Sequence, residues 1–345
     1  MFKGISKKRI LITLLCIVLF TAAAILIAIL TPVSIPADTG GMIATYTRNK
    51  PNVRLSVSLI TPDGTSIYVY KHDGKQISDT DTVYEIANIT KTFTGALTAR
   101  AVLDGRLSMD AYVNEILPIP STGYIPTIGE LATQTSAYAD FKPAKVGKGT
   151  YPYSGINDFD ILMAMTEFEP SSPGPYMYSN SDFGAALLGT VIGDIYSSNF
   201  ITVLNDFIHM DLGLRNTYVA TGSDKPRYGN KWVVSDAYIA AIGLSSTIDD
   251  ITAYVKMILN QSIDYFAVAA TPLKEINEDT ESGYMWIISR KTGIASCYGG
   301  TSHYSSAILM DVSTGKGVVV LSNYSDDKYG SVYSIANAFM TKING

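Results

Sequence analysis

The hydrophobic pattern of the chain begins with one long apolar run near the N-terminus. Residues 10–30 contain no charged side chain, and the basic residues before them are Lys3, Lys7, Lys8 and Arg9. With a rise of about 1.5 Å per residue, a helix of this length spans the roughly 30 Å hydrocarbon core of a bilayer. Basic flanks favour the cytoplasmic side. The pattern therefore predicts a cytoplasmic segment at 1–9, a single-pass transmembrane anchor at 10–30 and an extracytoplasmic domain held at the cell membrane.

A cleaved signal peptide is the alternative interpretation of the same pattern. Signal peptides also carry basic residues, but their apolar run is usually about 7–15 residues long and ends at a small-x-small cleavage site. Here the run is longer and leads into a stretch at 31–36 that contains two prolines. This favours a retained anchor followed by a linker over 31–49, and the cleaved form stays open.

Patterns with a period of two residues predict strands at both ends of the remaining chain. Residues 54–61 alternate apolar and polar side chains, Pro62-Asp63-Gly64 forms a turn signal, and 66–70 return as a second strand of a hairpin. Further strand patterns and a closing helix follow near the C-terminus, the strands at 283–290, 293–298, 304–311 and 317–323 and the helix at 331–343.

Helical periodicity dominates the region between these strands. Phe93, Leu97 and Ala101 recur at helical spacing and predict a helix over 90–103, which Asp104-Gly105 ends. Similar patterns predict helices at 182–195, 201–211 and 248–259. Strands at both chain ends with helices between them indicate an α/β (α+β) fold with one antiparallel sheet assembled from both ends. We expect one domain at 50–345, with sheet parts at 50–105 and 280–345 and a largely helical insertion at about 106–279.

Composition narrows the class of protein. The chain has 345 residues, of which 47% are hydrophobic, so it can bury the core of one large domain. Its formal net charge is -5 and no basic run lies outside the N-terminus, which argues against nucleic acid as a partner. The two cysteines are Cys16, inside the expected anchor, and Cys297. A disulfide between them is geometrically implausible, so the domain must be stabilised by packing.

Several stretches together resemble one known family. They are YEIANITKTFTG at 84–95, PTIGELATQTSA at 126–137, PGPYMYSNSDFGAALLG at 173–189, LGLRNTYV at 212–219, GLSSTIDDITAYV at 243–255, GYMWII at 283–288 and CYGGTSHYSSAIL at 297–309. Their content and order are similar to those of the serine β-lactamase and DD-peptidase superfamily, particularly the class C β-lactamase-like serine hydrolases. The resemblance extends from about residue 50 to the C-terminus and implies the fold of that family.

The resemblance also implies the parts of an acyl-transfer site. In the family's Ser-x-x-Lys motif, serine and lysine lie on one face at the start of a helix, so that the amine can take the hydroxyl proton. Lys91 matches that lysine. Tyr178 and Asn180 match the Tyr-x-Asn motif, in which the tyrosine relays protons and the asparagine holds the substrate amide. Gly299 matches the glycine of the third motif, and Gly300 matches a backbone donor of the oxyanion hole.

Three positions depart from the family pattern. Asn88 stands in place of the serine, Cys297 in place of a lysine or histidine, and Gln134 in place of a histidine. The nitrogen of a carboxamide shares its lone pair with the carbonyl, so Asn88 cannot form an acyl-enzyme. The literal Lys-Thr-Gly at 291–293 offers a third motif, but its register relative to the strand at 304–311 predicts a hairpin turn instead.

Simpler interpretations exist for each of these residues. Lys91 alone could be a solvated helix residue, Tyr178 a packing residue, and Asn180 the N-cap of the helix that starts near 182. Cys297 fits a buried small residue better than a replacement nucleophile. The histidines are widely separated and form neither a zinc site nor a Ser-His-Asp triad; they are His72, His209 and His303. No motif calls for a metal or an organic cofactor.

Three functional hypotheses follow. The first is a membrane-anchored homologue of these serine hydrolases that is catalytically impaired at Asn88 and binds a peptide, a cell-wall fragment or a partner protein. The second is an active hydrolase (a β-lactamase, DD-peptidase or esterase) in which Asn88 is an introduced substitution or is bypassed by water or Cys297. The third is a structural or regulatory membrane protein that uses the fold only as a scaffold. The substrate itself is not fixed by fold.

Overall fold

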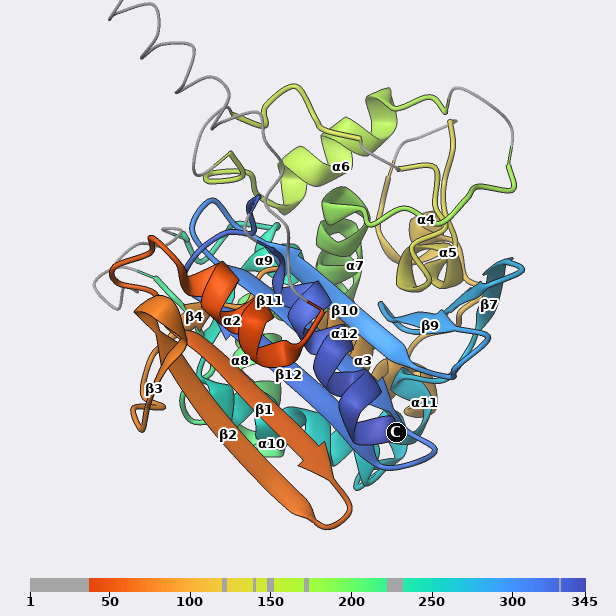
Figure 1. Ribbon diagram of the computed structural model, residues 1–345. Helices are drawn as coiled ribbons and strands as arrows, with labels where there is room; N and C mark the ends of the chain where they lie inside the picture. The colour runs from red at the N-terminus through yellow and green to blue at the C-terminus, as the bar shows by residue number, and fades with distance from the viewer. Residues whose placement is uncertain are drawn as a thin grey trace, which may run out of the picture.

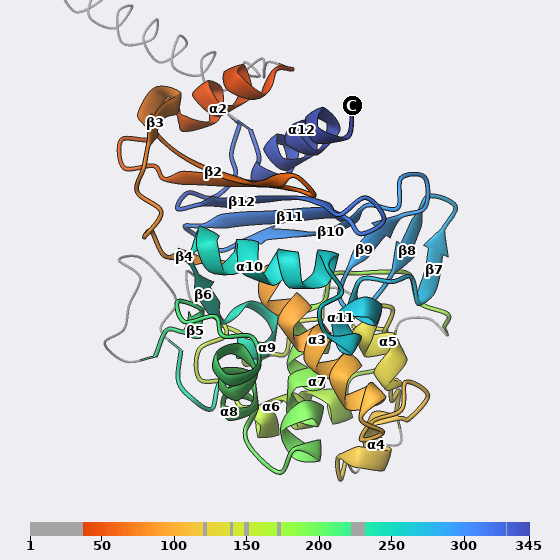
Figure 2. The same ribbon diagram turned by 90° about the horizontal axis from the view of Figure 1, so that it is seen from below.

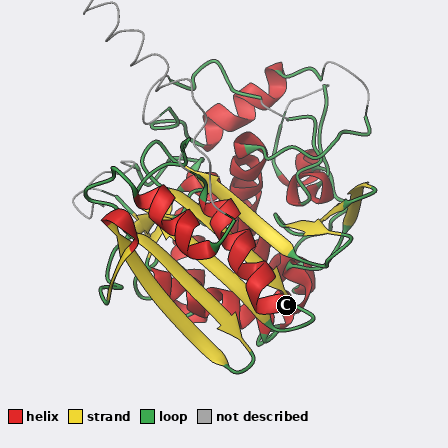
Figure 3. Ribbon diagram, in the orientation of Figure 1, coloured by secondary structure: helices red, strands yellow, loops and turns green. Residues whose placement is uncertain are grey.

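The computed structural model describes residues 37–119, 123–138, 141–147, 152–170, 174–221, 232–328 and 330–345. Within these ranges helices lie on both faces of a central sheet (Figures 1 and 3). In Figure 2, α2 (Thr39–Thr47) and α12 (Val332–Asn344) cover one face of the sheet, whereas α3 (Ile89–Leu103) and α10 (Ile248–Leu259) lie against the other. The described part of the chain is therefore layered, with one core on each side of the sheet.

The central sheet has nine strands, and neighbouring strands are antiparallel. Its order is β3 (Lys75–Ile77), β2 (Gly64–Lys71), β1 (Leu55–Thr61), β12 (Lys316–Ser322), β11 (Ser305–Asp311), β10 (Ala295–Gly300), β9 (Ile287–Ser289), β8 (Thr280–Ser282) and β7 (Lys274–Asn277). The two ends of the domain meet where β1 pairs with β12, with Leu55 opposite Ser322. The antiparallel sheet predicted from both chain ends is confirmed.

The inner strands are apolar on both faces because helices cover both faces. Along β11, Ala307 and Leu309 pack in the core beneath α2 and α12, whereas Ile308 and Met310 pack in the core on the α3 side. Successive side chains of a strand point to opposite faces. A strand buried on both faces therefore has a continuous apolar run instead of strict alternation.

The helical region lies between the two sheet parts of the sequence. Its elements are α4 (Val113–Ile116), α5 (Ile128–Ala132), α6 (Asp158–Glu167), α7 (Asp182–Ile195), α8 (Phe200–Asp206), the π-helix η2 (Phe207–Asp211), α9 (Ile239–Ile242) and α11 (Asp264–Ala269); the short η1 (His72–Gly74) lies outside this region, between β2 and β3. A small sheet of β4 (Tyr84–Glu85), β6 (Leu244–Ser246) and β5 (Tyr218–Val219) joins it to α3. Because β4 leads directly into α3, this small sheet fixes where that helix begins.

Three sequence expectations differ from the structure. The expected linker over 31–49 contains α2, whose Met42, Ile43 and Tyr46 are buried in the core shared with α12. The expected helical insertion to 279 already contains β7, an edge strand of the main sheet. The expected strand over 283–290 is reduced to β9, because the backbone N–H of Met285 donates to Ala132 instead of joining the strand ladder.

The expected anchor at 10–30 lies outside the described residues. Among the residues that are described, no single helix combines the length and the apolar character needed to cross a membrane. Only α7 taken together with Phe200–Asp211 meets that test, as a pair bent by 80°.

Candidate active site

The corner that begins α3 places Asn88 in the site. Ala87, directly before it, has a φ of +47°, which is the left-handed region that non-glycine residues rarely adopt. Two hydrogen bonds at Ile86 hold this corner: its N–H donates to Leu244, and its carbonyl accepts from Ser306. The side chain of Asn88 makes no capping bond to the helix. It is therefore free to point into the site.

The carboxamide of Asn88 is bonded at both of its ends. Its Nδ2 donates to the carbonyl of Tyr298 on β10 at 3.0 Å, and its Oδ1 accepts from Lys91 Nζ at 3.2 Å. A hydroxyl offers one donor and no rigid plane, whereas a carboxamide presents donor and acceptor at fixed positions. Asn88 thus links the start of α3 to the edge of the sheet.

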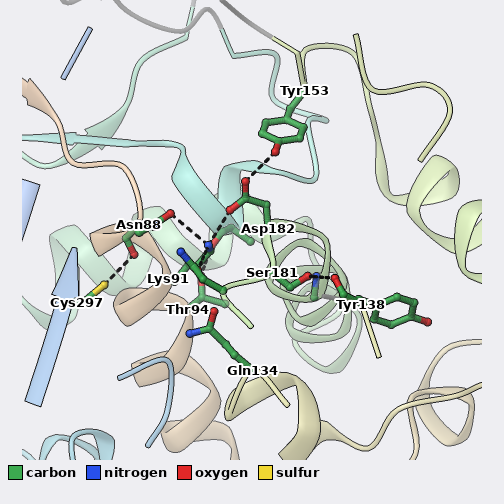
Figure 4. Close-up of polar contacts among 12 residues, drawn as sticks. Asn88, Lys91, Thr94, Gln134, Tyr138, Tyr153, Ser181, Asp182 and Cys297 are labelled. Atoms are coloured by element: carbon green, nitrogen blue, oxygen red, sulfur yellow. Dashed lines mark hydrogen bonds and ion pairs between the residues drawn. The ribbon is translucent and has the colours of Figure 1, made fainter. Parts of the chain in front are cut away.

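Lys91 is buried and has three acceptors around its amine. Its side chain is 1% exposed, and besides Asn88 its Nζ donates to Asn180 Oδ1 at 2.5 Å and to Asp182 Oδ1 at 2.7 Å. Figure 4 shows the amine between Asn88 of α3 and Asp182 of α7. The ammonium group has three N–H bonds. Each of them has an acceptor here, and Asp182 supplies the compensating negative charge.

The N-terminus of α7 positions Asn180 and Asp182. Ser181 caps this helix, because its Oγ accepts from Gly184 N–H at 3.0 Å and donates to the carbonyl of Tyr138 at 2.9 Å. The interpretation of Asn180 as the N-cap is therefore wrong. Asp182, the first residue of the helix, accepts from the Tyr153 hydroxyl through its Oδ2 at 2.8 Å (Figure 4). Burial, followed by the neighbouring Asp182 carboxylate, raises the pKa of Tyr153.

Tyr178 lies in the site beside Gln134. The Gln134 Nε2 donates to the Tyr178 hydroxyl at 3.4 Å, and the Gln134 carbonyl accepts from Ser179 N–H at 2.9 Å. Burial raises the pKa of Tyr178, so its phenol is neutral. Gln134 Oε1 is buried with no hydrogen-bond partner among the described residues. Gln134 also has a φ of +54°, so three residues with left-handed backbone, Ala87, Gln134 and Met285, border this site.

The edge of β10 completes the site. The Cys297 thiol donates to the carbonyl of Asn88 at 3.3 Å. Burial raises the pKa of this thiol to about 12, although the charge of Lys91 acts in the opposite direction. β10 pairs with β9 only at Ala295 and Ser296. Because backbone groups alternate between the two edges of a strand, the N–H of Gly300 points to the same open edge as the Tyr298 carbonyl.

Gly299 is required by the closeness of α3 and β10. A Cβ at this position would lie 2.4 Å from Asn88 Nδ2 and 2.6 Å from Asn88 Cγ. These distances are far below van der Waals contact. Any larger residue would push the Asn88 side chain away from Tyr298, so glycine allows the two elements to meet.

Six of the seven predicted site residues line one cavity of about 180 Å³, together with Gln134, Met285, Ile287, Ser296 and Tyr298; the six are Asn88, Lys91, Tyr178, Asn180, Cys297 and Gly299. Gly300 follows them on the β10 edge. The volume is below the roughly 300–1,000 Å³ of sites that enclose drug-sized ligands. Because Asn180, Tyr298 and Gly300 are exposed at its rim, the cavity suits one group of a ligand that extends across the surface.

One other sequence interpretation has a clear outcome. Lys291 to Gly293 form the turn between β9 and β10 and are exposed, as the turn interpretation predicts. Across the part of the chain that the structure describes, no group of three His, Cys, Asp or Glu side chains could hold a metal ion. The site itself presents amide, amine, hydroxyl, thiol and carboxylate groups.

Sequence reasoning missed Asp182 and Tyr153. Asp182 was available as a signal, since it lies two residues after Asn180 in the matched motif. An acidic residue in the first turn of a helix is, however, ordinary helix-dipole chemistry. Tyr153 gives no local signal, because its contact with Asp182 joins segments 29 residues apart.

The chain belongs to the Beta-lactamase family, whose model matches residues 43–336. The fold and the gathered motif residues agree with this class. Over 246 residues, covering 66% of the chain, it is 28% identical to a protein named Beta-lactamase from Providencia stuartii. Over 325 residues, covering 80% of the chain, it is 23% identical to Protein flp from Staphylococcus aureus strain MW2. The matches cover 60% and 64% of those two relatives, so the chain spans less than two thirds of their length.

Solved structures show the same fold. A Beta-lactamase/D-alanine Carboxypeptidase from Yersinia pestis, complexed with citrate, superposes with a TM-score of 0.72 at 17% identity, covering 88% of this chain and 97% of that one. A class C beta lactamase from Rhodobacter sphaeroides superposes with a TM-score of 0.68 at 19% identity, covering 85% and 95% respectively. At these identities the likeness concerns the fold alone.

Proposed function

We propose that this protein is a non-covalent ligand-binding member of the Beta-lactamase family. The observation that carries the proposal is that Asn88, at the position of the nucleophile, makes two side-chain hydrogen bonds. One joins it to Lys91 and the other to the Tyr298 carbonyl. No atom of this amide can attack a carbonyl carbon. Removal of the nucleophile from a well-studied serine protease costs about 10⁶ in kcat, so covalent turnover through residue 88 is lost.

The proposed ligand is a peptide or a cell-wall fragment. The open edge of β10 offers the N–H of Gly300 to an amide of an extended ligand. Gln134 Oε1, buried without a partner among the described residues, is one more acceptor for a ligand donor. The relatives named Beta-lactamase and D-alanine Carboxypeptidase support this choice, because β-lactams and D-alanine peptides both present amides.

A fluorescent penicillin tests the loss of covalent chemistry. We expect the purified full-length protein to show no covalent band after denaturing electrophoresis, while an active penicillin-binding protein in the same tube is labelled. Thermal unfolding with an uncleaved D-alanyl-D-alanine peptide tests binding, since a ligand of the native state raises the apparent melting temperature. Covalent attachment of the penicillin to any residue of the cleft would contradict the proposed loss of covalent chemistry.

The alternative is an active hydrolase of this family. The observation in its favour is that Lys91, Tyr178 and Asn180 still gather around one cavity. Either water or Cys297 would then replace the missing hydroxyl. Steady hydrolysis of a chromogenic β-lactam or ester by the unaltered protein, at a rate that falls in a Lys91→Ala variant, would establish this alternative.

We further propose that the domain is held outside the cytoplasm by residues 10–30. The apolar run and the basic residues before it support this placement. In intact cells, protease added from outside should digest the domain while the protein sediments with membranes. A domain that is protected until the cells are lysed would contradict the orientation.

A further inference from the structure

Asp182 is a second feature of the site, besides the change at residue 88, that bears on proton transfer through Lys91. To activate a hydroxyl at position 88, the lysine must present an unshared electron pair to it. In this site the amine donates to Asn88, Asn180 and Asp182. All three bonds of an ammonium group are then used as donors, and none of the surroundings requires the free amine.

The geometry points to Asp182 as a positioning residue that keeps the Lys91 amine engaged as a hydrogen-bond donor and so hinders proton abstraction independently of Asn88. This inference rests on the proposed non-covalent function and deepens it. The carboxylate lies 2.7 Å from Lys91 Nζ, and the lysine side chain is 1% exposed. An opposite charge at this distance favours the charged form. The free amine would leave the Asp182 carboxylate without its counter-charge.

Asp182 is the negatively charged contact of Lys91, because the other described groups that face this amine are neutral. Asn88 on α3 and Asn180 before α7 are neutral amides. On β10 burial raises the pKa of Cys297 to about 12, so that side presents a neutral thiol. The phenols nearest to this pair are neutral as well, because burial raises the pKa of each; they are Tyr178, Tyr153 and Tyr238.

Tyr153 fixes the orientation of the carboxylate. Its hydroxyl donates to Asp182 Oδ2 at 2.8 Å, which leaves Oδ1 directed to Lys91 (Figure 4). The ring of Tyr153 in turn stacks on Tyr238, with ring centroids 4.1 Å apart. Hydrogen bonds therefore hold the carboxylate at both of its oxygens. The ion pair belongs to a network that joins three segments of the chain.

Acylation of an Asn88→Ser variant measures the effect of Asp182. In that reaction the serine Oγ bonds to the β-lactam carbonyl carbon, the ring C–N bond breaks, and the serine proton passes through the Lys91 amine to the leaving nitrogen. The rate therefore depends on the fraction of free amine. We expect slow labelling of full-length N88S by fluorescent penicillin near neutral pH, rising steeply with pH.

The second substitution supplies the test. The double variant N88S/D182N should be labelled at least about tenfold faster than N88S near neutral pH, because the opposite charge is gone. The matched control is N88S/D250N: Asp250 is also largely buried, but it bonds to Asn216 and Thr217 and not to Lys91. This control should behave as N88S does.

Equal rates and pH profiles for N88S and N88S/D182N, including the absence of labelling in both, would overturn the inference. Circular dichroism shows whether each variant is folded, and Asp182→Ser replaces Asp182→Asn if the latter is not. The result is separate from the test of the proposed function. Labelling of the unaltered protein contradicts that function, whereas the comparison of the two variants judges Asp182.

Discussion

Asn88 forms a structural link between the start of α3 and β10. Its amide joins Lys91 to the β10 carbonyl of Tyr298, and its backbone carbonyl accepts from the Cys297 thiol. Together these bonds connect the start of α3 to β10. The close fit depends on Gly299, which leaves space for the Asn88 side chain.

Gly299→Ala should destabilise the protein by about 1–3 kcal/mol, the usual cost of overpacking a tightly packed site. The reason is that the new methyl group would lie 2.4 Å from Asn88 Nδ2. Chemical denaturation with urea measures the free energy of unfolding. A double-mutant cycle with Asn88→Ala is the control.

In the Asn88→Ala background, the cost of Gly299→Ala should become smaller but not vanish. The amide atoms are gone, but the Cβ of residue 88 still lies 2.8 Å from the position that the added methyl group would occupy. If the cost of Gly299→Ala is the same in both backgrounds, the clash with Asn88 is not its cause.

The motif residues of the site were predictable from sequence, whereas the ion pair was not. Asn88, Lys91 and Asn180 belong to short patterns with fixed spacing, and the fold brings them together as those patterns imply. The role of Asp182 depends on where α7 points relative to α3. That direction is set by packing between segments 91 residues apart, and no local pattern encodes it.

The first turn of α7 connects the stability of a helix to the geometry of the site. Ser181 caps this helix between two residues that bond to Lys91, namely Asn180 and Asp182. It also ties the helix to the Tyr138 carbonyl. Loss of the cap should therefore affect both stability and ligand binding.

Ser181→Ala should lower the free energy of unfolding by about 0.5–2 kcal/mol, the range measured for N-cap removal. It should also weaken binding of the D-alanyl peptide, because Asn180 and Asp182, the residues on each side of Ser181, accept hydrogen bonds from Lys91. Thermal unfolding with and without the peptide measures the two effects.

Asn199→Ala is the matched control, because Asn199 caps α8 through Thr202 N–H at 2.9 Å and does not line the site cavity. It should reduce stability by a similar amount and leave peptide binding unchanged. Equal binding by both variants would show that the Ser181 cap does not position the site.

The helices with bounds that could be predicted are those with capping and periodicity signals in their own sequence. The predicted bounds of the helices at 182–195 and 248–259 are those of α7 and α10, because each has a capping residue and helical periodicity. The helix α2 was missed, since its Thr39-Gly40-Gly41 start gives little helical signal. Its stability comes from packing against α12, which lies about 290 residues later in the chain.

The domain as a whole buries many tyrosines. The chain has 23 tyrosines, and burial raises the pKa of a large group of them, among which are Tyr46, Tyr84, Tyr124, Tyr138, Tyr153, Tyr178, Tyr238, Tyr254 and Tyr265. For Tyr84 and Tyr265 the pKa rises to about 12. These phenols lie on both sides of the sheet, so their ionisation affects both cores.

Alkaline pH should therefore unfold the protein. An unfolded tyrosine has a pKa near 10, whereas the buried ones ionise only at higher pH. The folded state then binds more protons than the unfolded state above about pH 10, so the free energy of unfolding falls as pH rises. Stability is fully present below pH 10 and is lost progressively up to and beyond pH 12, the value for Tyr84 and Tyr265.

Absorbance at the wavelength of ionised tyrosine, recorded with far-UV circular dichroism, measures this linkage. We expect one group of tyrosines to titrate while the protein stays folded, and the buried group to titrate together with the loss of secondary structure. The same chain in urea is the control, in which every tyrosine should titrate near pH 10. If the folded protein ionises all of its tyrosines in that range while its circular dichroism stays native, the two cores are open to hydroxide, and burial does not protect these phenols.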